Sequence, residues 1–126
     1  MSQFGHIDLR VTDLPAALAF YDQLLPALGF SERYHGETWK VWATTEPLPS
    51  TAYFAVTEER GHVANSNRIA FWVPSDAEVN GVTEVARGAG AMTVSGPKPM
   101  PYSPGYYASF FADPSGNLLE IYVRPE

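Results

Sequence analysis

Three side chains that could do chemistry recur at every second position near the start of the chain. His6, Asp8 and Arg10 alternate with aliphatic residues, and this period of two is typical of a strand with one apolar face. The three polar side chains would then point to the same side. An imidazole can move a proton or bind a metal ion, and a guanidinium can hold a carboxylate or phosphate. A purely structural histidine is the alternative.

A carboxylate interrupts an apolar segment near the end of the chain. Alternation places Glu120 on one strand face with Leu118 and Tyr122. An unpaired buried charge is costly, so this carboxylate needs a partner. An ordinary outward-facing glutamate is the alternative. We therefore expect Glu120 to belong to a ligand site.

Other residues could shape a ligand cleft. Arg10 and Arg68, if they point inward, favour a substrate with an anionic group. Trp42 and Trp72 lie opposite the apolar stripes of their strands, where they could wall a cleft or bury a subunit contact. The segment 96–104 has four prolines in nine residues, which excludes a central strand. We expect a stiff loop or lid from which Tyr102 reaches into the cleft.

Composition excludes several functions. The chain has 126 residues, no Cys, and 8 Lys and Arg against 14 Asp and Glu. This length suits one domain, and the missing Cys excludes disulfides, Cys-ligated zinc and thiol nucleophiles. A net charge of −6 argues against nucleic acid as a partner. Because no apolar run approaches about 18 residues and no signal segment is evident, we expect a cytoplasmic protein without a membrane partner.

An internal repeat divides the chain into two similar halves. The alternation of residues 6–13 recurs at 68–76. We expect three further strands after each repeat and its helix, at 30–35, 38–44, 51–57, 92–95, 106–112 and 118–123. The pattern predicts an α+β domain over residues 1–126, with one βαβββ module at about 1–60 and a second at about 66–126. A doubly wound parallel sheet would need more helices.

The helices have readable ends. Asp13 is an N-cap for the first helix, and Ser75 and Glu78 have capping-box spacing for the second. Pro26 should break or kink the first helix, with Gly29 ending the segment.

These features resemble the glyoxalase/bleomycin-resistance/extradiol-dioxygenase (vicinal oxygen chelate) superfamily. The resemblance is carried by the opening His6-Ile-Asp-Leu-Arg-Val and by the ending Asp113-Pro-Ser-Gly-Asn-Leu-Leu-Glu120. It implies that the two modules curl into an open eight-stranded half-barrel with a concave cleft. It also implies a homodimer, and it suggests that Arg10 contacts an anionic part of the substrate.

The resemblance implies a divalent metal site (Zn, Ni, Mn or Fe) that this sequence supplies only in part. Its first and last ligands match His6 and Glu120, which implies that these two side chains meet inside a shared hollow as the reacting pair. The position in the fifth strand falls on Arg68, and the position in the fourth strand falls near Phe54 or Val56. Guanidinium has no lone pair for a metal. We therefore hypothesise that Arg68 pairs with Glu120 and that its charge replaces the metal charge. Glu58 could be a ligand only in another register.

Two functions follow. In the first, the protein is a glyoxalase-like small-molecule enzyme, with lyase, isomerase or dioxygenase-type chemistry. His6 and Glu120 are its catalytic residues, and the residues that bind its substrate are Asp8, Arg10, Trp42, Phe54, Arg68, Trp72, Tyr102 and Tyr122. In the second, the protein is a non-catalytic small-molecule binder of the bleomycin-resistance type. An acidic net charge suits a cationic ligand of such a binder.

Overall fold

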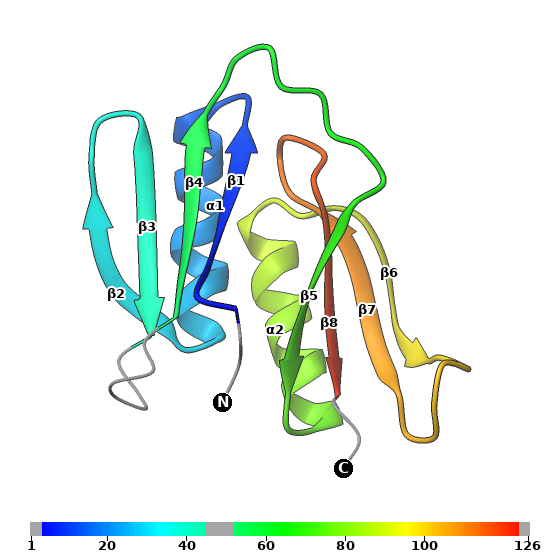
Figure 1. The fold of residues 1–126 in the computed structure, drawn as a ribbon. Helices are drawn as coiled ribbons and strands as arrows, with labels where there is room; N and C mark the ends of the chain where they lie inside the picture. The colour runs from blue at the N-terminus through cyan, green and yellow to red at the C-terminus, as the bar shows by residue number, and fades with distance from the viewer. Residues whose placement is uncertain (1–3, 45–51, 124–126) are drawn as a thin grey trace.

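The protein consists of two βαβββ modules. The computed structural model describes residues 4–44 and 52–123. The elements in chain order are β1 (His6–Val11), α1 (Leu14–Ala27), β2 (Phe30–His35), β3 (Trp39–Thr44), β4 (Tyr53–Glu58), β5 (Arg68–Val73), α2 (Asp76–Ala89), β6 (Met92–Pro99), β7 (Tyr107–Ala112) and β8 (Leu118–Val123). The predicted α+β class and paired modules are confirmed. Figure 1 shows the modules side by side, joined by the segment between β4 and β5. Neither described helix has the length and apolarity that a membrane span requires.

The strands form two four-stranded sheets, one in each module. The orders are β1-β4-β3-β2 and β5-β8-β7-β6, so β1 and β5 are equivalent edge strands. No strand ladder joins the two sheets within the described residues, and the arrangement stays open. The start of the predicted strand 51–57 includes Thr51, which lies outside the described residues; β4 begins at Tyr53. The proline-rich segment continues β6 to Pro99, which an edge strand tolerates.

The helix ends follow local chemistry. The Asp13 side chain accepts a hydrogen bond from the backbone N–H of Ala16 at the start of α1. The helix ends one residue after Pro26, because proline has no backbone N–H to donate and its ring crowds the carbonyl four residues earlier. Gly29 follows with φ of 91°. Ser75 is the predicted N-cap of α2: its side-chain oxygen accepts a 3.2 Å hydrogen bond from the backbone N–H of Glu78. The Ser75 hydroxyl also donates to the Glu78 carboxylate at 3.0 Å, a side-chain contact in place of the backbone bond that would complete a capping box.

Both helices and one face of each sheet share a single core. α1 packs against α2, and Phe54 of β4 lies 5.7 Å from Phe71 of β5 between ring centroids. Apolar residues from both modules therefore bury one another. The opposite face of each sheet is covered by neither helix, and we call these the N-terminal open face and the C-terminal open face.

A buried carboxylate joins the modules. Asp113, in the turn between β7 and β8, is fully buried and accepts a 2.7 Å hydrogen bond from the Tyr21 hydroxyl of α1. It also accepts bonds from the backbone of Ser115 and from the backbone and side chain of Asn117. The Asn117 amide in turn donates to the backbone carbonyl of Arg10 in β1. The pKa of Tyr21 is raised well above its ordinary value, first by burial and then by Asp113, so the phenol remains a donor.

Replacing Tyr21 with Phe should lower the free energy of unfolding by about 1–3 kcal/mol, because a buried acceptor loses its partner. Urea unfolding at neutral pH measures this change. The matched control is Tyr107→Phe, which removes an exposed bond to Asn80 and should change stability by less than about 0.5 kcal/mol. Equal effects of the two variants would contradict a dominant role for this junction.

Candidate functional site

The predicted trio of β1 lies together on the N-terminal open face. Arg10 forms a 2.9 Å ion pair with Asp8, which also accepts a hydrogen bond from Thr57 of β4. Both charged side chains are about half exposed, so solvent weakens their attraction. His6, one strand rung further away, stacks on Tyr53 with 4.3 Å between ring centroids. Arg10 is therefore already paired with a carboxylate of its own face.

Glu120 lies on the C-terminal open face and is only 5% exposed. Its Oε2 accepts a short hydrogen bond from the hydroxyl of Tyr106, just before β7. The Tyr106 ring stacks on Tyr122 of β8, and Tyr102 meets it edge-on from the β6–β7 connection. The partner that a buried carboxylate requires is thus a tyrosine.

Arg68 shares this face but does not pair with Glu120. Its guanidinium carbon lies 4.9 Å above the ring of Phe110 in β7. In the parallel ladder Arg68 is opposite Leu118, whereas Ala70 is opposite Glu120. The hypothesis of an Arg68–Glu120 ion pair is therefore wrong for this structure, because a cation–π contact holds the guanidinium one rung away. Arg68 is exposed, and its fork remains accessible to an anion.

His6 and Glu120 lie on the open faces of different sheets. A cavity of about 240 Å³ lies between β1 and β5, and His6 and Ala70 both line it. Glu120, the ladder partner of Ala70, is not among the residues that line this cavity. This cavity therefore does not bring the two side chains together, and their meeting in one hollow stays a prediction.

Two expected cleft residues lie in the core instead. Trp42 is fully buried and Phe54 is 1% exposed, and both contact Tyr21 of α1 on the helix-covered face of their sheet. Their assignment as substrate-binding residues is corrected, because the helix covers the face that we expected to be open. The indole N–H of Trp42 donates to Asp22 of α1 at 2.8 Å.

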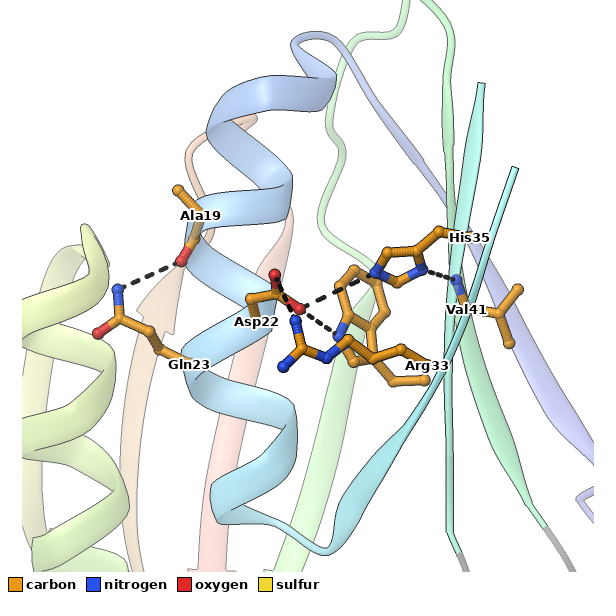
Figure 2. Close-up of polar contacts among 7 residues, drawn as sticks. Ala19, Asp22, Gln23, Arg33, His35 and Val41 are labelled. Carbon is orange, nitrogen blue, oxygen red and sulfur yellow. Dashed lines mark hydrogen bonds and ion pairs between the residues drawn. The ribbon is translucent and has the colours of Figure 1, made fainter. Parts of the chain in front are cut away.

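Asp22 is the centre of a polar cluster beside α1. Figure 2 shows Arg33 and His35 converging on it, with Arg33 at 3.2 Å and His35 Nε2 at 3.9 Å. His35 Nδ1 accepts from the backbone N–H of Val41. This cluster anchors β2 and β3 to the helix and lies away from both open faces.

Of the remaining candidates, one lines the cavity beside β5 and two surround Tyr106 on the C-terminal open face. Trp72 is 54% exposed and lines both the 240 Å³ cavity and a neighbouring cavity of about 510 Å³. Tyr102 and Tyr122 surround Tyr106. Glu58 instead accepts a hydrogen bond from the first backbone N–H of α1, at Leu14, so it is not at an open face.

The residues do not fit a resident catalytic metal within one chain. A catalytic divalent ion usually takes about three protein ligands. His6 and Glu120 belong to strands of different sheets, Arg68 offers no lone pair, and the residue of β4 beside Asp8 is Ala55. No group of three or more His, Asp or Glu side chains within residues 4–44 and 52–123 could hold an ion.

Sequence reasoning missed Tyr106. The residue precedes the strand in which Ala108 and Phe110 alternate, and Phe110 is the ladder partner of Glu120. Combining that alternation with the hairpin turn at Asp113 would have placed Tyr106 on the face of Glu120. Its hydrogen bond to Glu120 depends on the fold of the β6–β7 connection, which alternation does not describe.

The family of the chain follows from comparison with known proteins. The sequence pattern of the glyoxalase/bleomycin resistance protein/dioxygenase superfamily matches residues 3–121. The chain belongs to this superfamily.

Two individual relatives show how similar the chain is to known proteins. The chain is 30% identical over 126 residues to the uncharacterised protein PA2024 of Pseudomonas aeruginosa, covering 95% of this chain and 88% of the relative. A glyoxalase/bleomycin resistance protein from Albidiferax ferrireducens has 23% identity and a TM-score of 0.79, with 98% of this chain and 100% of that chain covered.

A fosfomycin resistance protein, FosX, from Listeria monocytogenes shares the fold. A mutant of it, complexed with Mn(II) and 1S,2S-dihydroxypropylphosphonic acid, has 22% identity and a TM-score of 0.71, covering 99% of this chain and 92% of that chain. At these identities the structural likeness establishes the fold.

The two tryptophans should differ in how much each contributes to the stability of the fold. Trp42→Phe removes a buried hydrogen bond and packing volume, so it should lower the free energy of unfolding by about 1–3 kcal/mol. Trp72→Phe changes an exposed side chain and should stay within about 0.5 kcal/mol. Urea unfolding of both variants gives the comparison, and a larger loss for Trp72→Phe would contradict the placement of the two rings.

Proposed function

We propose that this protein is a glyoxalase-like small-molecule enzyme that uses Glu120 as its proton acceptor and needs no resident metal. The observation that carries the proposal is a nearly buried carboxylate, Glu120, held by a phenol on an aromatic open face. Burying a carboxylate is costly, and Glu120 forms no ion pair in the described residues that would offset this cost, which favours a functional role for it. A proton acceptor shielded from water is a good general base.

Arg68 would bind an anionic group of the substrate. Its exposed guanidinium lies over Phe110 on the same face as Glu120. A planar fork of this kind can hold a carboxylate or phosphate through two hydrogen bonds. It would also stabilise negative charge that develops when Glu120 removes a proton from a carbon next to a carbonyl. This chemistry is that of a lyase or isomerase. Dioxygenase-type chemistry needs more metal ligands than the described residues provide.

The complete site would form in a homodimer. Among the residues that the structure describes, β1 and β5 each pair with a strand on one side only, and unpaired edges of this kind readily accept another strand or a partner chain. A two-fold pair that sets β1 of one protomer beside β5 of its partner repeats the same contact twice. Such a pair would bring the β1 face, with His6, to the face that carries Glu120 in the partner.

Replacing Ala70 with Arg should convert the dimer to a monomer. Ala70 is exposed in the middle of the β5 edge, where a long charged side chain would prevent close approach. The folded chain should be unaffected, so circular dichroism should stay unchanged while light scattering after gel filtration reports half the mass. Ala19→Arg, on the exposed side of α1, is the matched control. A wild-type monomer would contradict the composite site.

A second candidate is a non-catalytic binder of a small organic molecule. The observation that favours it is the number of large aromatic side chains exposed on the open faces: Tyr34, Trp39, Tyr53 and Trp72. Exposed aromatic surfaces commonly mark binding sites. The net charge of −6 would favour a cationic ligand over the anionic substrate of the first candidate.

Ligand screening followed by hydrogen exchange separates the two candidates. Melting temperatures measured against small organic acids, aromatic cations and divalent metals identify ligands through the stabilisation that binding produces. The carbon-bound hydrogens of each hit are then followed by NMR in D₂O. Exchange with the wild type but not with Glu120→Gln supports the enzyme. Binding of aromatic cations without exchange supports the binder, and one tightly bound metal ion per chain contradicts a metal-free site.

A further inference from the structure

A small cavity lies at one end of the C-terminal open face. Its volume is about 200 Å³, and it is lined by residues of all four strands of this sheet, among them Arg68, Thr93, Phe110, Ala112 and Leu118. No Asp or Glu of the described residues lines it. Pockets for drug-sized ligands measure roughly 300–1,000 Å³, so this cavity suits one functional group of a larger molecule.

The side chain of Arg68 reaches across the sheet to this cavity. Strand β8 lies between β5 and β7 (Figure 1), yet the guanidinium carbon lies 4.9 Å from the centre of the Phe110 ring in β7. Adjacent strands are about 4.8 Å apart, so the side chain crosses Leu118, its ladder partner in β8. The guanidinium forms no hydrogen bond or ion pair within the described residues, and its N–H donors therefore remain available for a ligand.

Thr93 has a backbone conformation that threonine rarely adopts. Its φ is 56°, in the left-handed region, where a β-branched residue is strained. The residue lies where the register of β6 and β7 shifts, between Met92 and Ser95, and irregularities of this kind re-aim side chains beside functional sites. The Thr93 hydroxyl has no hydrogen-bond partner within the described residues. Glycine would adopt this conformation without strain, so the backbone by itself does not require a threonine here.

The cavity lies close to the proposed proton acceptor. Leu118, which lines the cavity, precedes Glu120 by two residues in β8, a distance of roughly 7 Å along a strand. Glu120 itself is not among the lining residues. Its carboxylate is hydrogen-bonded to Tyr106, which precedes β7 and therefore lies beyond Glu120, away from the cavity. A group held in the cavity and a carbon beside Glu120 can thus belong to one short molecule.

We infer that this cavity is a phosphate subsite, in which Arg68 and Thr93 together hold the phosphate group of the substrate. The inference rests on the proposed function for the position of the reacting carbon at Glu120. A carboxylate has two oxygens, and a guanidinium fork that binds it uses both. A phosphate ester has three terminal oxygens, so one remains for the hydroxyl of Thr93. The substrate class is therefore a short carbonyl compound whose phosphate group lies a few bonds from the carbon that loses its proton.

Calorimetric titration with inorganic phosphate tests the subsite, with acetate as the carboxylate probe. We expect the wild type to bind phosphate more tightly than acetate. Arg68→Gln should weaken phosphate binding about 10- to 100-fold, because it removes a charged donor pair, and Thr93→Val about 3- to 10-fold, because it removes one neutral donor and keeps the shape of the side chain. The affinity for acetate should depend on Arg68 and not on Thr93.

Two control variants separate the subsite from general effects. Arg87→Gln removes a positive charge from α2, and Thr57→Val removes a hydroxyl from the N-terminal open face; both should leave phosphate binding unchanged. An equal loss in Arg87→Gln, a Thr93→Val variant that binds phosphate as the wild type does, or a wild type that does not bind phosphate would overturn the inference. Phosphate binding as expected, without exchange of carbon-bound hydrogens at Glu120, would contradict the proposed function alone.

The strained conformation of Thr93 gives a second test. Thr93→Gly removes the hydroxyl and relieves the strain at a φ of 56°. We therefore expect this variant to be at least as stable in urea as the wild type, and to lose at least as much phosphate affinity as Thr93→Val. A clear loss of stability in Thr93→Gly would mean that the threonine serves the fold, and it would overturn the role of Thr93 in the subsite.

Discussion

The buried carboxylate of Asp113 is the contact on which the rest of the arrangement depends. It accepts hydrogen bonds from α1 and from its own turn, and a buried carboxylate left without these partners would strongly destabilise the fold. The bond from Tyr21 can form only when the helix of the first module faces the last hairpin of the second. The modules therefore pack through their helices, with Phe54 and Phe71 in one core. The two open faces are the sheet faces that this packing leaves uncovered.

This packing explains why the chemically useful residues are divided. His6, Asp8 and Arg10 lie on one open face, and Arg68 and Glu120 lie on the other. The 240 Å³ cavity between β1 and β5 is lined by His6 but not by Glu120. The two bare edge strands are equivalent in the two modules, which is the geometry that a two-fold pair of chains can complete. Assembly and function would then be linked, because one protomer presents only half of the groups.

On the C-terminal open face, the carboxylate of Glu120 is compensated by a hydrogen bond and not by an ion pair. A carboxylate low in exposure must be compensated by a cation or by hydrogen bonds. Here Tyr106 provides the hydrogen bond, whereas the guanidinium of Arg68 is held over Phe110. The carboxylate keeps its basic oxygen and the guanidinium keeps its fork, and each remains available to a ligand. A direct ion pair would have consumed both.

The sequence by itself determined the repeat, the α+β class, both helix caps, and the grouping of His6 with Asp8 and Arg10, because these depend on local periodicity and on side chains a few residues apart. Only the tertiary structure decided which face each helix covers. In β3 the face of Trp39, Val41 and Ala43 is more apolar than the face that Trp42 shares with Lys40 and Thr44, so alternation pointed to the wrong face as the one that the helix covers. That is why Trp42 and Phe54 were misplaced. The placement of His6 and Glu120 on different open faces, and the contact of Tyr106 with Glu120, depend on how distant segments pack, which no local pattern encodes.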